Sequence, residues 1–240
     1  MDFTSLYSTR IQTNFDDDLA LILKTFHGSR GSKSDCQVIL TNYYKGLPIT
    51  YPATILGVDR GNLDLEVNMQ QAVAIAADRY TLVRSKLFPH AMVAHVQYVN
   101  VKKHIASLNK LGFVEVLAER RAAVRLDMDP LTRFSLECGG QQIAGKLTDI
   151  SIIGAAALLD SSFEFEPGKE VVAKFMLPDI ALEKQTEMTV RAIPVSLGGS
   201  GAPYRCGLKI FPEKQQEQLI SRYSFQRQVE IIRGLKEMAE

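Results

Sequence analysis

The sequence predicts a mainly β protein that consists of two small antiparallel β-barrels in tandem, with one helix at each end of the chain. Short segments rich in Val, Ile, Leu and Tyr, separated by turn residues, occupy two stretches, from about residue 35 to 101 and from about residue 122 to 211. Helical patterns stand before the first stretch and after the second. Several short strands at close spacing are typical of small barrels, and this pattern predicts the fold class.

Length and composition narrow the class of protein. A chain of 240 residues fits two ordinary domains or one large one, and 46% hydrophobic and 23% charged residues are typical of a soluble globular protein. The formal net charge of +1 produces no global field that would attract nucleic acid or an anionic membrane. We therefore expect no nucleic-acid partner and no membrane insertion, and any anion site must be local.

We expect neither a signal peptide nor a membrane helix. The first ten residues of the chain lack the basic region and apolar run of a signal peptide, and its longest apolar run is far shorter than a membrane helix requires. The three cysteines are odd in number and widely spaced, which argues against a disulfide framework or a CxxC metal site. We expect a cytoplasmic protein.

Residues 14–29 predict the first helix. Asn14 or an aspartate can cap it, the acids Asp16–Asp18 suit its positive N-terminal end, and Gly28 can stop it. Its apolar face would consist of Leu19, Leu21, Ile22, Leu23 and Phe26. The alternative is a metal site at the three acids, but adjacent carboxylates on a helix point in different directions, so we expect no metal.

The chain ends in a second predicted helix, which starts near residue 213. Its apolar residues recur at spacings of four and three, and they form one stripe of Phe225, Val229, Ile232 and Leu235. The stripe could pack across the second barrel, and its arginines, Arg222, Arg227 and Arg233, would then face solvent. The alternative is that the stripe forms a homodimer or tetramer.

Two groups of polar residues in the second half are candidate binding residues. Arg121 and Arg125 have the spacing R-x-x-x-R, with Arg120 directly before them. About two dozen residues later, the turn-like segment "TDISIIG" places Asp149, Ser151 and Gly154 in the pattern D-x-S-x-x-G. Each group alone is common, as a solvated basic pair or as a hairpin turn that satisfies its own backbone. Together, before and inside one barrel, they form a more specific signal.

This combination resembles the signature of PilZ domains, the bacterial receptors for cyclic di-GMP. The segment "GKEVVAKFMLP" is similar to a strand of the family, and "YRCGLKIF", which contains Gly207, is similar to its closing strand. The resemblance covers about half of the chain, from Arg120 to the C-terminus. A β domain ahead of a PilZ domain resembles the two-domain YcgR type. The expected domains are residues 1–112, a switch linker of residues 113–125 without rigid structure, and residues 126–240.

The resemblance implies that cyclic di-GMP is the ligand, and the chemistry of the residues agrees. Guanidinium groups bind phosphate oxygens bidentately and also bond the O6 and N7 edge of guanine. The resemblance assigns Arg121 and Arg125 to these contacts, and it implies that Arg120 helps to hold a second, stacked ligand molecule. Asp149 and Ser151 offer acceptors, and Asp149 suits the N–H donors of guanine. Glycine at position 154 permits close approach of the ligand.

The expected function is that of a receptor whose domain arrangement changes when ligand binds. It would act through a protein partner, such as the flagellar motor, on motility, or on biofilm and surface behaviour. The alternatives are a ligand-independent PilZ-like scaffold and a nucleic-acid-binding barrel that uses the same arginines. The histidines lack metal spacing, and no nucleophile elbow or phosphate loop is present, so we expect no enzyme.

Overall fold

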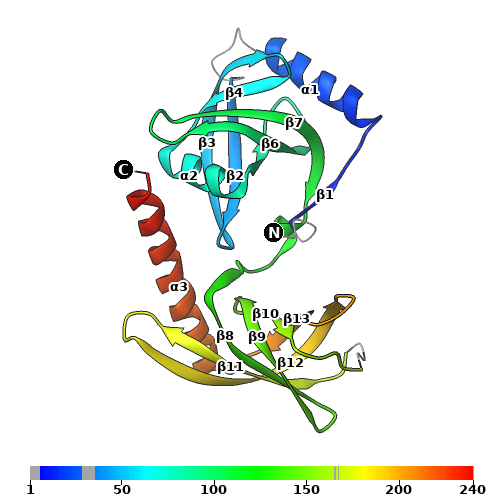
Figure 1. Ribbon diagram of the computed structural model, residues 1–240, viewed down its shortest axis with the longest axis vertical. Helices are drawn as coiled ribbons and strands as arrows, with labels where there is room; N and C mark the ends of the chain where they lie inside the picture. The colour runs from blue at the N-terminus through cyan, green and yellow to red at the C-terminus, as the bar shows by residue number, and fades with distance from the viewer. Residues whose placement is uncertain (1–5, 29–35, 165, 167, 240) are drawn as a thin grey trace. The chain divides into compact units, whose positions relative to one another are not determined.

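The protein consists of two β-barrels that follow each other in the chain, as the computed structural model in Figure 1 shows. The structure describes residues 6–28, 36–164, 166 and 168–239. Its two compact units are Met1–Ala122 with Ile232–Glu240, and Ala123–Ile231. Both barrels have six antiparallel strands, and helices lie near both ends of the chain. The predicted fold class is confirmed.

The first barrel closes because its first and last strands in the sheet order pair with each other. The order is β7-β4-β3-β2-β5-β6, β6 pairs with β7, and the short strand β1 (Tyr7–Thr9) adds to β7. Alternate residues face the core; in "NLDLE", for example, Leu63 and Leu65 are fully buried. The six strands are β2 (Gln37–Tyr44), β3 (Leu47–Asp59), β4 (Asn62–Glu66), β5 (Tyr80–Arg84), β6 (Ala91–Asn100) and β7 (Ile105–Val116).

Helix α1 (Phe15–Gly28) begins where the capping pattern predicts. The Asn14 side chain accepts a hydrogen bond from the backbone N–H of Asp17 (2.9 Å), which satisfies one of the free donors of the first turn. Asp18 is buried and accepts a bond from the backbone N–H of Gln12 (2.9 Å). The acids therefore hold the helix start, and no cluster of three metal-ligating side chains occurs among the described residues.

The buried side of α1 is narrower than its sequence predicts. Ile22 and Phe26 are buried, whereas Leu21 is half exposed. Ser29, the last residue of the predicted helix, lies outside the described residues, as do residues 1–5. Within the described part of the chain, none of the helices combines the length and the apolar character needed to cross a membrane.

Helix α2 (Met69–Asp78) lies between two strands of the first barrel and was not predicted. The side chain of Asn68 caps it by accepting a bond from the helix backbone (2.9 Å). The fully buried Asn42 of β2 fixes the helix to the barrel, because its amide donates to Asp78 (2.9 Å) and accepts from Gln71 (2.8 Å). A buried network of this kind specifies one position for the helix.

The segment before the second barrel is more regular than the sequence suggests. Residues 113–116, expected to begin a linker without rigid structure, are the end of β7, and a 3-10 turn follows at Leu117–Arg120. That expectation is therefore wrong for the first part of the segment. The physical reason is that Phe113, Val114 and Val116 are apolar and become buried.

The second barrel is a closed sheet in the order β10-β13-β12-β11-β8-β9. Its core consists largely of alternating side chains of the strands, for example Phe134 of β8 and Phe175 of β11. The six strands are β8 (Leu126–Cys138), β9 (Gln141–Ile150), β10 (Gly154–Leu159), β11 (Val171–Asp179), β12 (Lys184–Gly198) and β13 (Tyr204–Phe211).

Helix α3 (Lys214–Glu237) buries only Leu235 of the four residues in the predicted stripe. Phe225 is 68% exposed, and Val229 and Ile232 are exposed as well. The buried row has a spacing of four and consists of Tyr223, Arg227, Ile231 and Leu235. The expectation that Arg227 faces solvent is therefore wrong, because this arginine occupies a buried position within the row.

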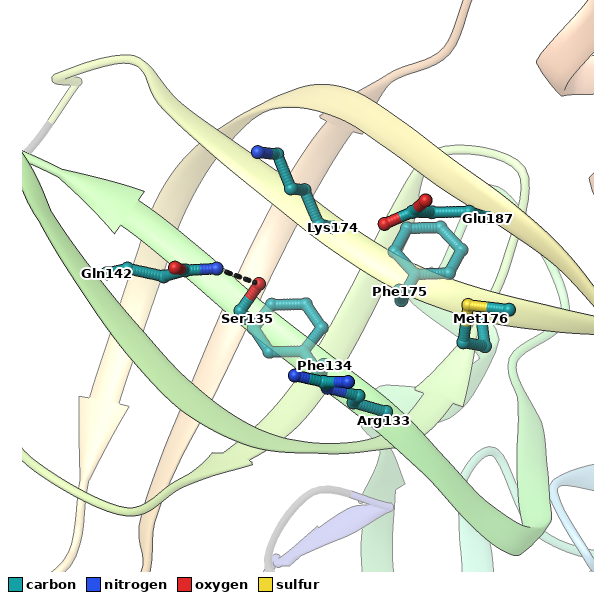
Figure 2. A pocket seen from close by; sticks show the side chains of 8 residues that line it. All are labelled: Arg133, Phe134, Ser135, Gln142, Lys174, Phe175, Met176 and Glu187. Carbon is teal, nitrogen blue, oxygen red and sulfur yellow. Dashed lines mark hydrogen bonds between the residues drawn. The ribbon is translucent and has the colours of Figure 1, made fainter.

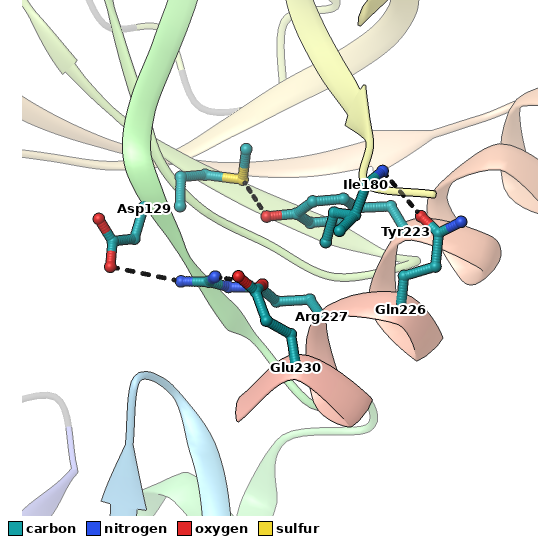
Figure 3. A network of polar contacts seen from close by, with 7 residues as sticks. Asp129, Ile180, Tyr223, Gln226, Arg227 and Glu230 are labelled. Carbon is teal, nitrogen blue, oxygen red and sulfur yellow. Dashed lines mark hydrogen bonds and ion pairs between the residues drawn. The ribbon is translucent and has the colours of Figure 1, made fainter. Parts of the chain in front are cut away.

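Two side chains of α3 hold the beginning of β8 (Figure 3). The Tyr223 hydroxyl donates to the sulfur of Met128 (3.3 Å), and the Arg227 guanidinium lies 3.5 Å from the Asp129 carboxylate and 2.6 Å from that of Glu230. Met128 and Tyr223 belong to the core cluster of the second barrel. Helix α3 is thus anchored to the strand on which the second barrel begins.

Tyr223 causes the stability of the second barrel to decrease at alkaline pH. Burial raises the pKa of Tyr223 from its ordinary value of 10.0 to about 12. The folded state therefore retains a proton that the unfolded state loses, so this stability is complete below pH 10 and declines as pH rises from 10 to 12. In denaturant titrations across that range, Tyr223→Phe should lose less stability than the wild type. Equal losses would contradict this assignment.

Candidate functional site

A row of residues crosses the outer face of the second barrel at the D-x-S-x-x-G segment. Asp127 of β8 pairs with Asp149 of β9, Asp149 with Ala156 of β10, and Ala156 with Gly207 of β13. Directly paired residues lie on the same face of a sheet. The flanking residues Ile150 and Ala155 belong to the core cluster of the barrel, so the row between them faces outward.

The register also places Arg125 beside this row. It directly precedes Leu126, which pairs with Ile150, and Ile150 lies between Asp149 and Ser151. The backbone of Arg125 therefore adjoins the aspartate–serine segment. Within the described chain, the half-buried side chain of Arg125 forms no hydrogen bond or ion pair. Its guanidinium donors are thus available to a ligand.

Asp149 carries an acceptor that the protein leaves unused. Its side chain is only 8% exposed, and its Oδ2 lies 3.4 Å from a guanidinium nitrogen of Arg205. Its Oδ1 is buried without a hydrogen-bond partner in the described structure. A buried acceptor without a donor costs free energy, and such atoms are rare in folded proteins. A ligand that donates to Oδ1 would recover this cost.

The turn from Ser151 to Gly154 is closed by its own hydrogen bonds. The carbonyl of Gly154 accepts both the backbone N–H (2.7 Å) and the hydroxyl (3.1 Å) of Ser151. The serine hydroxyl therefore donates its hydrogen bond within the turn, and its oxygen lone pairs can still accept a bond from a ligand. A Cβ at Gly154 would lie 3.2 Å from the carbonyl oxygen of Leu208, so the turn packs closely against β13.

Small residues form the floor beside Asp149. Ala156 and Gly207 pair across β10 and β13, and neither has a side chain longer than a methyl group. A Cβ at Gly207 would lie 2.6 Å from the hydroxyl of Ser196, its partner on β12. The floor next to Asp149 is therefore low, which suits a flat ligand such as a nucleobase.

Arg120 and Arg121 belong to the first unit, because the division falls after Ala122. Arg120 forms an ion pair with Glu115 of β7, and the neighbouring Glu119 forms a bidentate pair with Arg84 of β5. These exposed pairs tie the 3-10 turn to the first barrel. A groove of about 300 Å³ runs beside them, and its basic lining comprises Arg10, Arg84, His90 and Arg120.

Arg121 acts electrostatically on a tyrosine of the first barrel. Burial raises the pKa of Tyr43, the Glu119 carboxylate raises it further, and the guanidinium groups of Arg121 and Arg84 oppose this rise. The motif arginines are thus shared between the units: Arg121 belongs to the first and Arg125 to the second, where Asp149 also lies.

Sequence reasoning missed Arg205. It lies on β13, two positions before Gly207, and is half exposed. No motif marks it, because its contact with Asp149 joins residues 56 positions apart. The alternation of "YRCGLKIF" was the available signal: Cys206 and Leu208 are buried, which turns Arg205, Gly207 and Lys209 to the outer face.

Another groove lies on the second barrel, away from these residues. A groove of about 220 Å³ is lined by Arg133, Ser135, Lys174 and Glu187, among others, and Figure 2 shows these side chains. Lys174 is paired with the Glu137 carboxylate (2.5 Å), so the charges around the groove are mixed. None of the predicted site residues lines it.

Comparisons with known proteins give a family match for the second half of the chain. Residues 119–226 match the family model of the PilZ domain. No curated protein matches the chain. The solved structures that resemble it include the inhibitor of motility MotI from Bacillus subtilis, which is 15% identical with a TM-score of 0.43 and covers 83% of this chain and 99% of its own.

Two further solved structures are known with ligand. YcgR from Escherichia coli, in complex with c-di-GMP, is 14% identical with a TM-score of 0.43, and the match covers 95% of this chain and 100% of YcgR. The MrkH–c-di-GMP complex from K. pneumonia is 13% identical with a TM-score of 0.45 and has the same coverage, 95% and 100%. These are distant likenesses in fold.

Proposed function

Because residues 119–226 of this chain form a PilZ domain, we propose that the protein is a receptor for cyclic di-GMP. The observation that carries this proposal is the register of β8 and β9. It brings Arg125 close to Asp149, and among the described residues neither the guanidinium of Arg125 nor the buried Oδ1 of Asp149 has a hydrogen-bond partner. The proposed ligand has phosphates and guanine O6 and N7 atoms for the arginine, and guanine N–H groups for the aspartate.

The proposed binding residues are those of the two motifs, with Gly207 in the floor. Arg121 and Arg125 bind phosphate and guanine, Asp149 and Ser151 accept from the ligand, and the glycines leave room for it. Arg120 takes part in holding a second, stacked ligand, and it must then give up its ion pair with Glu115. An exposed pair of this kind contributes only about 0–1 kcal/mol, so its loss is a small obstacle.

Ligand binding is proposed to change the arrangement of the two barrels. Arg121 belongs to one unit and Arg125 to the other, and one ligand that binds both would constrain the angle between the units. Small-angle scattering should therefore give different profiles with and without cyclic di-GMP. Identical profiles under saturating ligand would contradict the conformational part of the proposal.

The receptor is proposed to act through a protein partner in the cytoplasm. The regulated process would be motility, through the flagellar motor, or biofilm and surface behaviour.

The exposed stripe of Phe225, Val229 and Ile232 on α3 is the surface through which the protein would form a homodimer. Light scattering of the wild type and of Phe225→Ser tests this association. A monomer in both cases would remove the homodimer from the proposal.

Calorimetric titration of the full chain tests the proposed function. The wild type should bind cyclic di-GMP and should not bind a single-stranded RNA at the same salt concentration. Binding of RNA alone would favour the nucleic-acid barrel. Binding of neither ligand would favour the ligand-independent scaffold. Either of these two results would reject the proposal of a cyclic di-GMP receptor.

A further inference from the structure

The ion pair between Arg205 and Asp149 presents a fixed order of hydrogen-bonding groups. Arg205 offers guanidinium donors next to Oδ2 of the carboxylate, and the buried Oδ1 follows without a partner. Followed through these contacts, from the guanidinium to Oδ2 and then to Oδ1, the order is donor, acceptor, acceptor. Arg205 is half exposed, and one of its nitrogens contacts Oδ2 at 3.4 Å, so its other N–H groups can still donate to a ligand.

This order is the complement of one edge of guanine. The Watson–Crick edge of guanine runs from the acceptor O6 through the donor N1–H to the donor N2–H₂. If N1–H and N2–H₂ bond the two carboxylate oxygens, O6 lies beside the guanidinium. We propose that Arg205 determines the base specificity of the site, by donating to O6 while it orients Asp149 for the two N–H groups. This inference rests on the proposed function.

Adenine cannot satisfy the same groups. Its edge has a donor where guanine has O6, and an acceptor where guanine has N1–H, so the guanidinium would face an amino group and the carboxylate a lone pair. A site that is built to bond a polar edge rejects a ligand that leaves its buried groups unpaired. The pair therefore selects guanine by attraction and excludes adenine by leaving Asp149 without a donor.

The other cation of this strand is not equivalent. Lys209 lies four positions along β13, pairs with Gly154 across the strands, and places its ammonium 5.3 Å from the ring centre of Phe211. It has no contact with Asp149 among the described interactions. Lysine also lacks the planar fork by which arginine can bond a carboxylate and a carbonyl oxygen at once. Of these two cations on β13, Arg205 is therefore the one to which a role in selecting the base is assigned.

The test compares cyclic di-GMP with cyclic di-AMP, which has the same ring of riboses and phosphates but adenine bases. Calorimetry with the full-length wild type should give binding of cyclic di-GMP and much weaker binding of cyclic di-AMP. Arg205→Ala should lose roughly 10- to 100-fold in affinity for cyclic di-GMP, because one charge-assisted bond is lost, with little change for cyclic di-AMP. The ratio of the affinities for cyclic di-GMP and cyclic di-AMP should therefore decrease. Arg205→Lys should recover part of the affinity.

The matched control is Arg191→Ala, which also removes an exposed arginine from the barrel; Arg191 pairs with Glu170 (3.6 Å). It should leave both affinities and the melting temperature unchanged. If Arg205→Ala binds cyclic di-GMP with wild-type affinity and selectivity, the role of Arg205 is refuted while the receptor stands. If the wild type binds no cyclic di-GMP, both proposals fail. A melting temperature equal to that of the wild type shows that Arg205→Ala folds.

Discussion

Replacing Arg125 by alanine is expected to weaken binding of cyclic di-GMP by roughly ten- to a hundredfold. Each charge-assisted hydrogen bond contributes about 1.5–3 kcal/mol, and 1.4 kcal/mol corresponds to a tenfold change in affinity. Arg125 adjoins Asp149 and Ser151 through the pairing of Leu126 with Ile150. Because its side chain has no partner among the described residues, the substitution should leave the melting temperature unchanged. Calorimetry and thermal unfolding measure the two effects.

The control for this variant is Arg133→Ala. Arg133 lies on β8, the strand that Arg125 directly precedes. It is exposed and likewise has no partner within the described chain, but it lines the groove of Figure 2. It should bind ligand like the wild type. Arg121→Ala, in the other unit, is expected to weaken binding in the same range as Arg125→Ala. Wild-type affinity in either motif variant would contradict the assignment of that arginine.

Gly145→Ala is expected to cause the largest loss of stability. Gly145 lies on β9, where it pairs with Phe134 of β8 and Leu159 of β10. A Cβ on it would lie 2.2 Å from the carbonyl oxygen of Leu158, a backbone atom that cannot move aside without shifting β10. Overpacking of this kind costs roughly 3 kcal/mol, which corresponds to a fall of about 6–12 °C in melting temperature for a chain of this size.

The matched substitution is Gly198→Ala. Gly198 lies at the end of β12 in the same barrel, and a Cβ there meets no atom within 4 Å. Its melting temperature should stay near that of the wild type. Similar melting temperatures for the two variants would mean that β9 and β10 are not packed as closely as described. The site depends on this packing, because the same two strands pair Asp149 with Ala156.

The fold class could be predicted because it depends on local patterns. Alternation in segments such as "NLDLE" and turn residues between them indicate short strands without any knowledge of their partners. Helix α2 was missed because "MQQAVAIAAD" is a short apolar run between strands, where periodicity does not separate a helix from a buried strand. The cap at Asn68 was the one local signal for it.

Three of the four residues predicted to form the buried face of α3 were wrong, for a similar reason. A hydrophobic stripe assumes that charged residues face water, and Arg227 breaks that rule at the centre of the buried row. Its guanidinium is accommodated because the Asp129 and Glu230 carboxylates lie beside it (Figure 3). The partner Asp129 comes from a distant strand, so sequence alone gave no sign of it.

In the site, too, only the residues marked by local sequence patterns could be predicted. The residues of the two motifs were identified from their spacing, and their role in binding stays a prediction. Arg205 has no spacing that marks it, because its relation to Asp149 exists only after β9, β10 and β13 have paired. A sequence pattern names the residues that one segment contributes, whereas the folded barrel shows which other side chains meet them.

The most direct test of the central claim is a crystal structure of the full chain with cyclic di-GMP. We expect Arg125 and Asp149 to lie within hydrogen-bonding distance of the same ligand molecule, with the ligand on the outer face of the second barrel beside Ala156 and Gly207. A ligand bound elsewhere, or one that contacts the arginine but not the aspartate, would contradict the account.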